Sequence, residues 1–389
     1  MISWEQIREL ADFQVDGKQE CALSFYLQPQ PPQDKSHRHE GILARDIVRN
    51  AQREVKHNGK NAAMAEDLRH ILQIVEDLRG NQTRAKAIFA CRSRNFWREF
   101  DLAPHLPASG LSASRRFHLW PLLMMLGQQT PLHVVVLDQK RARFFDLKND
   151  EIRERDGMFR ALAHRGRGDG WHGYDGGHSE RSRDDDVMHH FRDVAFRLKE
   201  ELEKGMWEKW IAGCLDVNWR NFEAQLHPQV KDRLVGRFSS APEISVDEVR
   251  ESAKSIFHST QEHRNHQLVR KVLSYAKSHK RGVTGLRRVL RSLELGEVQI
   301  LLVAENYSAH GVECVSCGRL DAHLVRYCAL CGRGTRRLND ILDAILPIAI
   351  RKDIEVVSVK NQELEQVGNI AALLRFRSSE SSATMAEAS

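Results

Sequence analysis

The sequence predicts a mixed α/β protein built from three domains. Stretches with an apolar residue every three or four positions, typical of helices, alternate with short apolar runs typical of strands. A chain of 389 residues is also too long for one ordinary domain. The pattern changes near position 130, where a continuous apolar run begins. We expect an N-terminal α/β domain over 1–128, a middle domain over 129–262, a C-terminal α/β domain over 263–376 and a disordered tail over 377–389.

The composition is that of a mildly basic globular protein. Lys and Arg number 59 against 53 Asp and Glu, a formal charge of +6, which allows an RNA partner without requiring one. No stretch approaches the ~18 consecutive apolar residues of a membrane span. The first ten residues lack the apolar core of a signal peptide. We therefore expect a cytoplasmic protein that does not associate with membranes.

In the first domain, helical and strand patterns alternate, as expected for an α/β unit. A turn-rich stretch and an apolar patch follow before the boundary near 128. We expect helices over 7–13, 41–55 and 62–78, strands over 22–27 and 87–90, turns over 102–112 and the apolar patch over 119–126.

Two paired strands are expected to open the middle domain. The continuous apolar run 133–137 suits a buried strand, and the alternating run 141–147 suits a strand beside it. Further strands are expected over 207–213 and 234–238. A long helical segment from 244 onward is expected to bridge into the last domain.

A glycine-rich basic loop, 164–183, is expected between the strand pair and the next helix. Six of the fifteen residues 164–178 are glycine, which lacks a side chain for packing and loses much backbone entropy on ordering. Arginine side chains bind phosphate well, so we expect this loop to contact RNA. The three aspartates at 184–186 would repel phosphate, and a solvated charged surface is the alternative. Aromatic side chains in the loop suit either stacking on RNA bases or packing on the scaffold. The residues concerned are Arg165, Arg167, Trp171, Tyr174, Gly176, Gly177, Arg181 and Arg183.

The helix after this loop has a clear sequence signal. Ser182 or Asp184 can cap its N-terminus, where the aspartates of 184–186 favour the helix dipole. Apolar residues then recur at three- and four-residue spacing and predict one buried face. They are Val187, Phe191, Val194, Leu198 and Leu202.

The C-terminal domain is expected to be an α/β sandwich with one main sheet. Helical and strand patterns alternate here, and a cysteine-containing insertion separates one strand from the following helix. We expect helices over 268–276, 285–296 and 338–350, and strands over 298–304, 354–359 and 371–376.

Four of the seven cysteines form two CxxC pairs separated by ten residues, Cys314, Cys317, Cys328 and Cys331. Each pair is followed by glycine, which permits the close backbone approach that zinc knuckles need. Four thiolates complete a tetrahedron without an open position, so we expect structural Zn²⁺. An empty knuckle or a redox pair is the alternative. The other three cysteines stand alone in apolar contexts and are expected to be buried, and an odd total argues against a disulfide framework.

Together these segments resemble the archaeo-eukaryotic release factor and Pelota family, most closely its bacterial branch. The resemblance covers essentially the whole chain in domain order. It is carried by VVVLDQKRARFFDL from 134, DGGHSERSRDDDVMHHFRDVA from 175, GLRRVLRSLELGEVQILLVAENY from 285 with the CxxC insertion after it, and GNIAALLRF from 368.

The resemblance implies a tRNA-shaped, three-domain protein that occupies the ribosomal A site and contacts rRNA. The first domain would face the decoding centre, and the middle domain would reach the peptidyl transferase centre. The third would have the fold of kink-turn-binding ribosomal proteins and contact the stalk base and a translational GTPase.

Release factors of this family carry Gly-Gly-Gln, where the matching residues here are Gly176, Gly177 and His178. The glutamine that positions water is therefore replaced, although a histidine can act as a base near neutral pH. Residues 1–128 also lack the Asn-Ile-Lys-Ser and Tyr-Cys motifs that read stop codons. The hypothesis is a ribosome-binding factor acting in rescue or hibernation. The alternatives are a peptidyl-tRNA hydrolase using His178 as catalytic residue and an RNA-binding protein acting off the ribosome.

Overall fold

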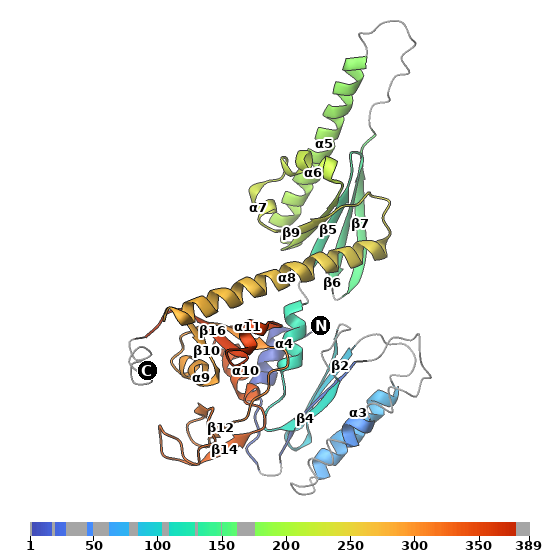
Figure 1. Cartoon of the computed structure of the whole chain (residues 1–389). Helices are drawn as coiled ribbons and strands as arrows, with labels where there is room; N and C mark the ends of the chain where they lie inside the picture. Colours follow the sequence, from blue (N-terminus) through green and yellow to red (C-terminus); the bar gives the residue numbers. More distant parts are fainter. Residues whose placement is uncertain are drawn as a thin grey trace. The chain divides into compact units, whose positions relative to one another are not determined.

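A computed structural model of the chain contains helices and several sheets, which confirms the predicted mixed α/β class (Figure 1). The contacts divide the chain into two compact units. The first contains 1–128 and 265–389, and the second contains 129–264. The structure describes residues 2–17, 20–28, 45–49, 62–77, 85–102, 109–128, 131–148, 150–161 and 176–378.

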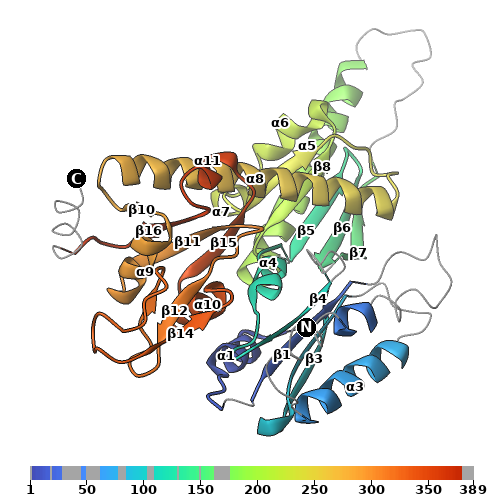
Figure 2. The same ribbon diagram turned by 60° about the horizontal axis from the view of Figure 1, so that its bottom comes forward.

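The N-terminal part of the first unit is a four-stranded antiparallel sheet in the order β3-β2-β1-β4. Helix α3 covers one face of it (Figure 2). The central strand β1 is buried throughout, because alternate residues face α3 on one side and α1 and α4 on the other. The elements are α1 (Trp4–Asp12), β1 (Ala22–Leu27), α3 (Ala62–Asp77), β2 (Ala85–Cys91), β3 (Phe96–Leu102), β4 (Gly110–Ser114) and α4 (Trp120–Gln128).

The C-terminal part of the first unit is a second four-stranded sheet, in the order β10-β16-β11-β15. Strands β11 and β15 run parallel, so the chain crosses over between them through the cysteine insertion and α10. The elements are β10 (Gly282–Thr284), α9 (Leu286–Glu294), β11 (Val298–Ala304), α10 (Leu342–Arg351), β15 (Glu355–Val359), α11 (Gln362–Glu365) and β16 (Ile370–Leu374).

One hydrophobic core joins these two sheets within the first unit. It contains residues of α1 and α4 together with residues of α9, α10 and the C-terminal strands. Polar contacts cross the same boundary: His118 Nδ1 lies 2.7 Å from Asp343 Oδ1, and Trp120 Nε1 donates to the Glu305 carbonyl at 3.0 Å. The predicted first and third domains are therefore in contact, and their division into separate domains stays a prediction.

The second unit is a five-stranded sheet in the order β7-β6-β5-β8-β9, with helices on both faces. Strands β5 and β6 are paired, as predicted, and run antiparallel. The expected buried face of α5 is also confirmed, because Phe191, Val194 and Leu198 are fully buried against the sheet. The elements are β5 (Leu132–Leu137), β6 (Arg141–Lys148), β7 (Glu151–Phe159), α5 (Gly176–Glu203), β8 (Trp210–Cys214), α6 (Asp216–Glu223), α7 (Pro228–Lys231) and β9 (Leu234–Phe238).

The predicted bridging helix is α8 (Val246–Lys277), a single helix that begins in the second unit and ends in the first. Its first part covers the other face of the five-stranded sheet, where Val249, Ala253 and Phe257 are buried. Its last part packs on the C-terminal sheet through Val269 and Val272. Within the described residues, no helix is both long and apolar enough to cross a membrane.

Candidate metal centre

The cysteine insertion forms a small three-stranded antiparallel sheet in the order β13-β12-β14. It lies between β11 and α10 in the sequence. Its strands are β12 (Gly311–Cys314), β13 (Leu320–Asp321) and β14 (Thr335–Leu338). The two CxxC turns lie at one end of this sheet, because β12 ends at Cys314 and β14 begins directly after the second turn. We refer to residues 311–338 as the knuckle.

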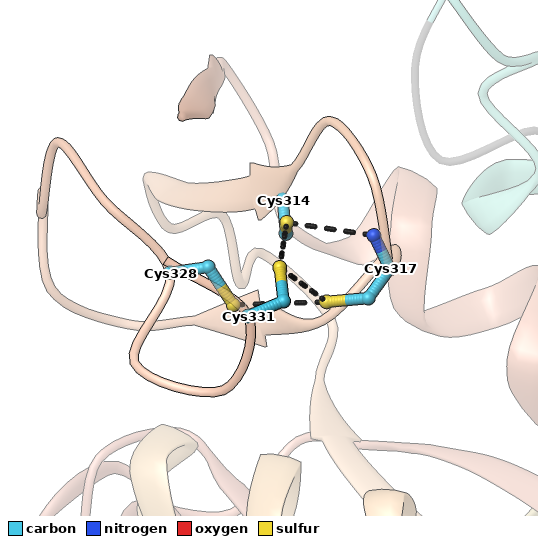
Figure 3. A group of neighbouring side chains, drawn as sticks. All are labelled: Cys314, Cys317, Cys328 and Cys331. Atoms are coloured by element: carbon cyan, nitrogen blue, oxygen red, sulfur yellow. Dashed lines mark hydrogen bonds between the residues drawn. The ribbon is translucent and has the colours of Figure 1, made fainter. Parts of the chain in front are cut away.

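The structure brings the four predicted cysteines together (Figure 3). All four sulfur atoms lie within 4.8 Å of one another. The Sγ of Cys314 is 3.4 Å from that of Cys331, and the Sγ of Cys317 is 3.6 Å from those of Cys328 and Cys331. These distances exceed the ~2.05 Å of a disulfide. They are close to the roughly 3.8 Å between sulfurs of a zinc tetrahedron with ~2.3 Å bonds.

The two turns have matching backbone hydrogen bonds. The amide of Cys314 donates to the Arg319 carbonyl at 2.9 Å, and the amide of Cys328 donates to the Arg333 carbonyl at 2.7 Å. Both bonds join the first cysteine of a pair to the residue five positions later. Because the two turns have the same backbone hydrogen bond, both segments can direct their thiols toward one point.

Glycine closes each turn, but the expected close backbone approach is wrong, because a Cβ at Gly318 or Gly332 would meet nothing within 4 Å. The turns need glycine for its backbone conformation. The amides of Gly318 and Gly332 donate to the carbonyls of Cys314 and Cys328 at 3.2 and 2.9 Å. Their φ angles are +72° and +67°, in the left-handed region that other residues adopt at a cost. The two glycines thus have a specific backbone function beside the clustered cysteines.

Amide groups in the turns favour thiolate at the first cysteine of each pair. The amides of Cys317 and Ser316 point at the Cys314 Sγ, at 3.5 and 3.4 Å, and lower the pKa of Cys314 to about 6. In the second turn, the amides of Cys331 and Leu330 lower the pKa of the Cys328 thiol in the same way. Thiolate is the form of cysteine that binds metal.

The donor set fits a structural zinc ion. Four soft sulfur ligands at tetrahedral spacing suit Zn²⁺ and leave no position for a water or a substrate. Cys314 and Cys328 are buried, whereas Cys317 and Cys331 are exposed, so the site lies at the surface of the unit. Such a site can hold two turns together but offers no open coordination position for chemistry.

A buried glutamate that the sequence reasoning missed attaches the knuckle to the N-terminal part. Glu313 lies beside the first cysteine, and its side chain is only 5% exposed. Arg116 donates to its two carboxylate oxygens at 2.5 and 3.1 Å, and Arg336 donates at 2.9 Å. Arg336 also contacts Asp16. No local pattern marks these residues, because Arg116 and Glu313 are 197 positions apart.

Several residues of the predicted RNA-contact loop fall outside the described residues. For others, the structure gives the backbone only, in the first turns of α5. Arg183 is half-buried on α5. Those outside are Arg165, Arg167, Trp171 and Tyr174, and those described by backbone alone are Gly176, Gly177, His178 and Arg181.

Helix α5 begins at Gly176, earlier than the cap expected at Ser182 or Asp184. The stretch before the aspartates contains Glu180 and two arginines, all good helix formers. Once the buried face of α5 has nucleated the helix, each added residue brings a hydrogen bond, so the helix extends toward its N-terminus. The Gly-Gly-His triplet is consequently the start of a helix, and the glycine-rich stretch ahead of it is shorter than predicted.

Residues 118–258 match the model of bacterial archaeo-eukaryotic release factor family 10. The predicted resemblance to the bacterial release-factor branch is confirmed. The match to family 10 covers the sheet of the second unit, α5 and the first part of α8. It therefore contains the Gly-Gly-His triplet and excludes the knuckle. No curated protein matches the sequence.

Solved structures of release factors and Pelota proteins are also similar to the chain. An archaeal translation termination factor, aRF1, is 16% identical, with 96% of this chain and 99% of that chain covered and a TM-score of 0.26. Dom34 of S. cerevisiae is 9% identical, with 97% and 95% covered and a TM-score of 0.40. Pelota of Archaeoglobus fulgidus is 13% identical, with 76% and 80% covered and a TM-score of 0.35. With identities and TM-scores this low, these structures assign no role to any residue of this chain.

Proposed function

We propose that the protein is a ribosome-binding, release-factor-like translation factor that occupies the A site in ribosome rescue or hibernation, without reading a stop codon. The observation that carries the proposal is the family 10 match over 118–258, which includes the Gly-Gly-His triplet at the start of α5. A translational GTPase is the further partner that the family resemblance predicts.

The packing of α5 supports the use of its N-terminal end as a contact element. The buried face of the helix begins at Val187, whereas Asp184 and Asp185 just before it are exposed. Figure 1 shows the N-terminal end of α5 extending beyond the sheet of its unit. A helix fixed along its later turns can hold its first turns in a defined position, as a contact on a large RNA requires.

The identity of the third triplet residue supports occupation in preference to hydrolysis. A glutamine amide offers both a donor and an acceptor on one planar group, and neutral histidine divides them between two ring nitrogens. Histidine at 178 therefore does not reproduce the group that orients water in the family. We propose that the triplet positions the protein and that peptide release is absent.

We also propose that the four knuckle cysteines hold one structural Zn²⁺. The support is the sulfur geometry together with the paired turns around it. Bound zinc would keep the CxxC turns closed, and in this site it would take no part in a reaction.

Sedimentation with purified 70S ribosomes tests the ribosomal role. Pelleting is expected to be strong at low salt and to fall as salt rises, because phosphate contacts release counterions. The double variant Arg181→Glu with Arg183→Glu should pellet less. Arg220→Glu, an exposed arginine on α6 of the same unit, is the control and should pellet like the wild type. No pelleting by the wild type would overturn the proposal in favour of a role off the ribosome.

A peptidyl-tRNA release assay separates occupation from hydrolysis. Ribosomes carrying a labelled peptidyl-tRNA are incubated with the wild type or with His178→Ala, and released peptide is measured. We expect no release above the ribosome-only background from either protein. Release by the wild type that disappears in His178→Ala would instead show a hydrolase with His178 in a catalytic role.

A further inference from the structure

Exposed apolar side chains gather on the knuckle. Of the twelve large hydrophobic residues that are exposed in the described part of the chain, five lie within 315–330. Tyr327 is 70% exposed, Leu330 64% and Val315 59%. Exposed apolar residues scattered singly need no explanation, whereas a group of this kind on a short segment marks an interaction surface. The five are Val315, Leu324, Val325, Tyr327 and Leu330.

Backbone contacts bring two of these residues next to one glycine. The amide of Val315 donates to the Gly334 carbonyl at 3.1 Å, and Tyr327 forms an antiparallel bridge with the same glycine. A side chain at Gly334 would meet nothing within 4 Å. Val315 and Tyr327 therefore both contact the backbone of a glycine that has open space beside it.

The fold of the knuckle does not require these apolar side chains. Its attachment to the body of the unit uses other residues, since Val312 is buried and Leu320 packs against the shared core. The proposed zinc ion holds the turns through the four sulfurs alone. Polar residues at Val315, Tyr327 and Leu330 would leave both arrangements intact, so the apolar surface needs another reason.

Two exposed arginines in the same stretch of the knuckle carry uncompensated positive charge. Arg326 and Arg333 are exposed, and neither forms an ion pair with any residue that the structure describes. The sequence from 315 to 333 contains a single acidic residue, Asp321, against three arginines. The third, Arg319, is paired with Glu294 at 3.4 Å. The surface therefore combines apolar side chains with free positive charge and suits a partner that is apolar and acidic.

We infer that the exposed surface of the knuckle over residues 315–333 is the docking site for an acidic amphipathic segment of another protein. The apolar side chains of the partner segment cover Val315, Tyr327 and Leu330. The carboxylates of that segment pair with Arg326 and Arg333. Protein is favoured over RNA because bases stack on aromatic rings, and Tyr327 is the only aromatic among the five exposed apolar residues. The inference does not depend on ribosome binding.

Fluorescence anisotropy with defined probes tests this docking site on the full-length, zinc-loaded chain. The probe is a labelled helical peptide of about 15 residues, with leucine on one face and glutamate elsewhere. A leucine–lysine peptide of the same pattern and a single-stranded oligouridine are the comparison probes. The acidic peptide should bind, and the lysine peptide and the RNA should not compete with it.

Two variants address the two halves of the recognition. Tyr327→Ser with Leu330→Ser, and Arg326→Glu with Arg333→Glu, should each weaken binding about tenfold or more. The control is Val217→Ser, which changes an equally exposed apolar residue on α6 and should bind like the wild type. Zinc content is measured for every variant, so that a loss of affinity with zinc retained reports on the surface.

Three results would overturn the inference. The first is equal affinity for the glutamate and lysine peptides, which would remove the role of charge. The second is tighter binding of the oligouridine, which would identify the surface as an RNA contact. The third is unchanged binding of the acidic peptide by both double variants, which would place its site elsewhere.

Discussion

Arg116 and Glu313 form a bidentate ion pair between the N-terminal sheet region and the first strand of the knuckle. Both side chains are nearly buried, at 13% and 5% exposure. Glu313 directly precedes Cys314, the first of the four clustered cysteines. The strand that ends in the first of the clustered cysteines is therefore also the strand to which the N-terminal part is attached.

Replacing Glu313 with Ala should destabilise the first unit by about 3 kcal/mol or more. The change leaves the largely buried Arg116 and Arg336 without their carboxylate, and removing one partner of a buried pair is strongly unfavourable. Denaturant unfolding measures the loss. Arg8→Ala is the control, because the Arg8–Asp353 pair is exposed and should contribute about 0–1 kcal/mol. Equal effects of the two changes would contradict a special role for Glu313.

Loss of the proposed zinc ion should loosen the N-terminal attachment as well as the knuckle. Cys328→Ser is expected to lose the bound zinc, and hydrogen exchange should then rise in β12 and around Arg116. Exchange in α3, which packs on the far face of the N-terminal sheet, should stay unchanged. Cys214→Ser is the matched control, since Cys214 is buried in β8 away from the cluster and should leave the zinc content intact.

Local signals were enough to predict the cysteine cluster and the buried face of α5. The cysteines are recognisable because each ligand pair and its glycine lie within five consecutive residues. The face of α5 is recognisable because burial repeats with the helical period. Both features depend on residues close together in the chain.

The missed features depend on distant partners or on weak patterns. Strand β7 is an edge strand whose side chains are largely exposed, so its sequence shows no apolar alternation. Strand β4 consists mainly of small residues and lies at the edge of the N-terminal sheet. Its sequence belongs to a stretch that resembles turns. Helices α6 and α7 are short and were not predicted. The pairing of Arg116 with Glu313 leaves no local trace at all.

A methyl group at Gly332 should destabilise the knuckle, whereas one at Gly334 should not. Gly332 has a φ of +67°, where an L-residue is strained by roughly 1 kcal/mol, although there is space for the added carbon. Gly334 has equal space and no left-handed backbone. Competition with a zinc chelator measures metal affinity in Gly332→Ala and Gly334→Ala. Weaker retention is expected only for the first, and equal retention by both would contradict the backbone argument.

The stability of the first unit should fall as pH rises above the ordinary range of histidine. Burial lowers the pKa of His118, but its hydrogen bond to Asp343 and the charge of that carboxylate outweigh this, so the pKa is raised above 6.5. For Asp343 burial acts in the opposite direction and raises the pKa above 3.8. A group whose pKa is raised on folding stabilises the folded state fully below its unfolded pKa, and this contribution is lost as pH rises through the folded value.

For His118 the loss therefore begins near pH 6.5 and continues upward, and for Asp343 it begins at more acidic pH. Urea unfolding of the wild type and of His118→Gln across this range isolates the histidine contribution. The wild type should lose more unfolding free energy than the variant between mildly acidic and mildly alkaline pH, because only the wild type releases a proton from His118 in that interval. Parallel pH profiles would show that the pair is neutral throughout and that Asp343 holds its own proton.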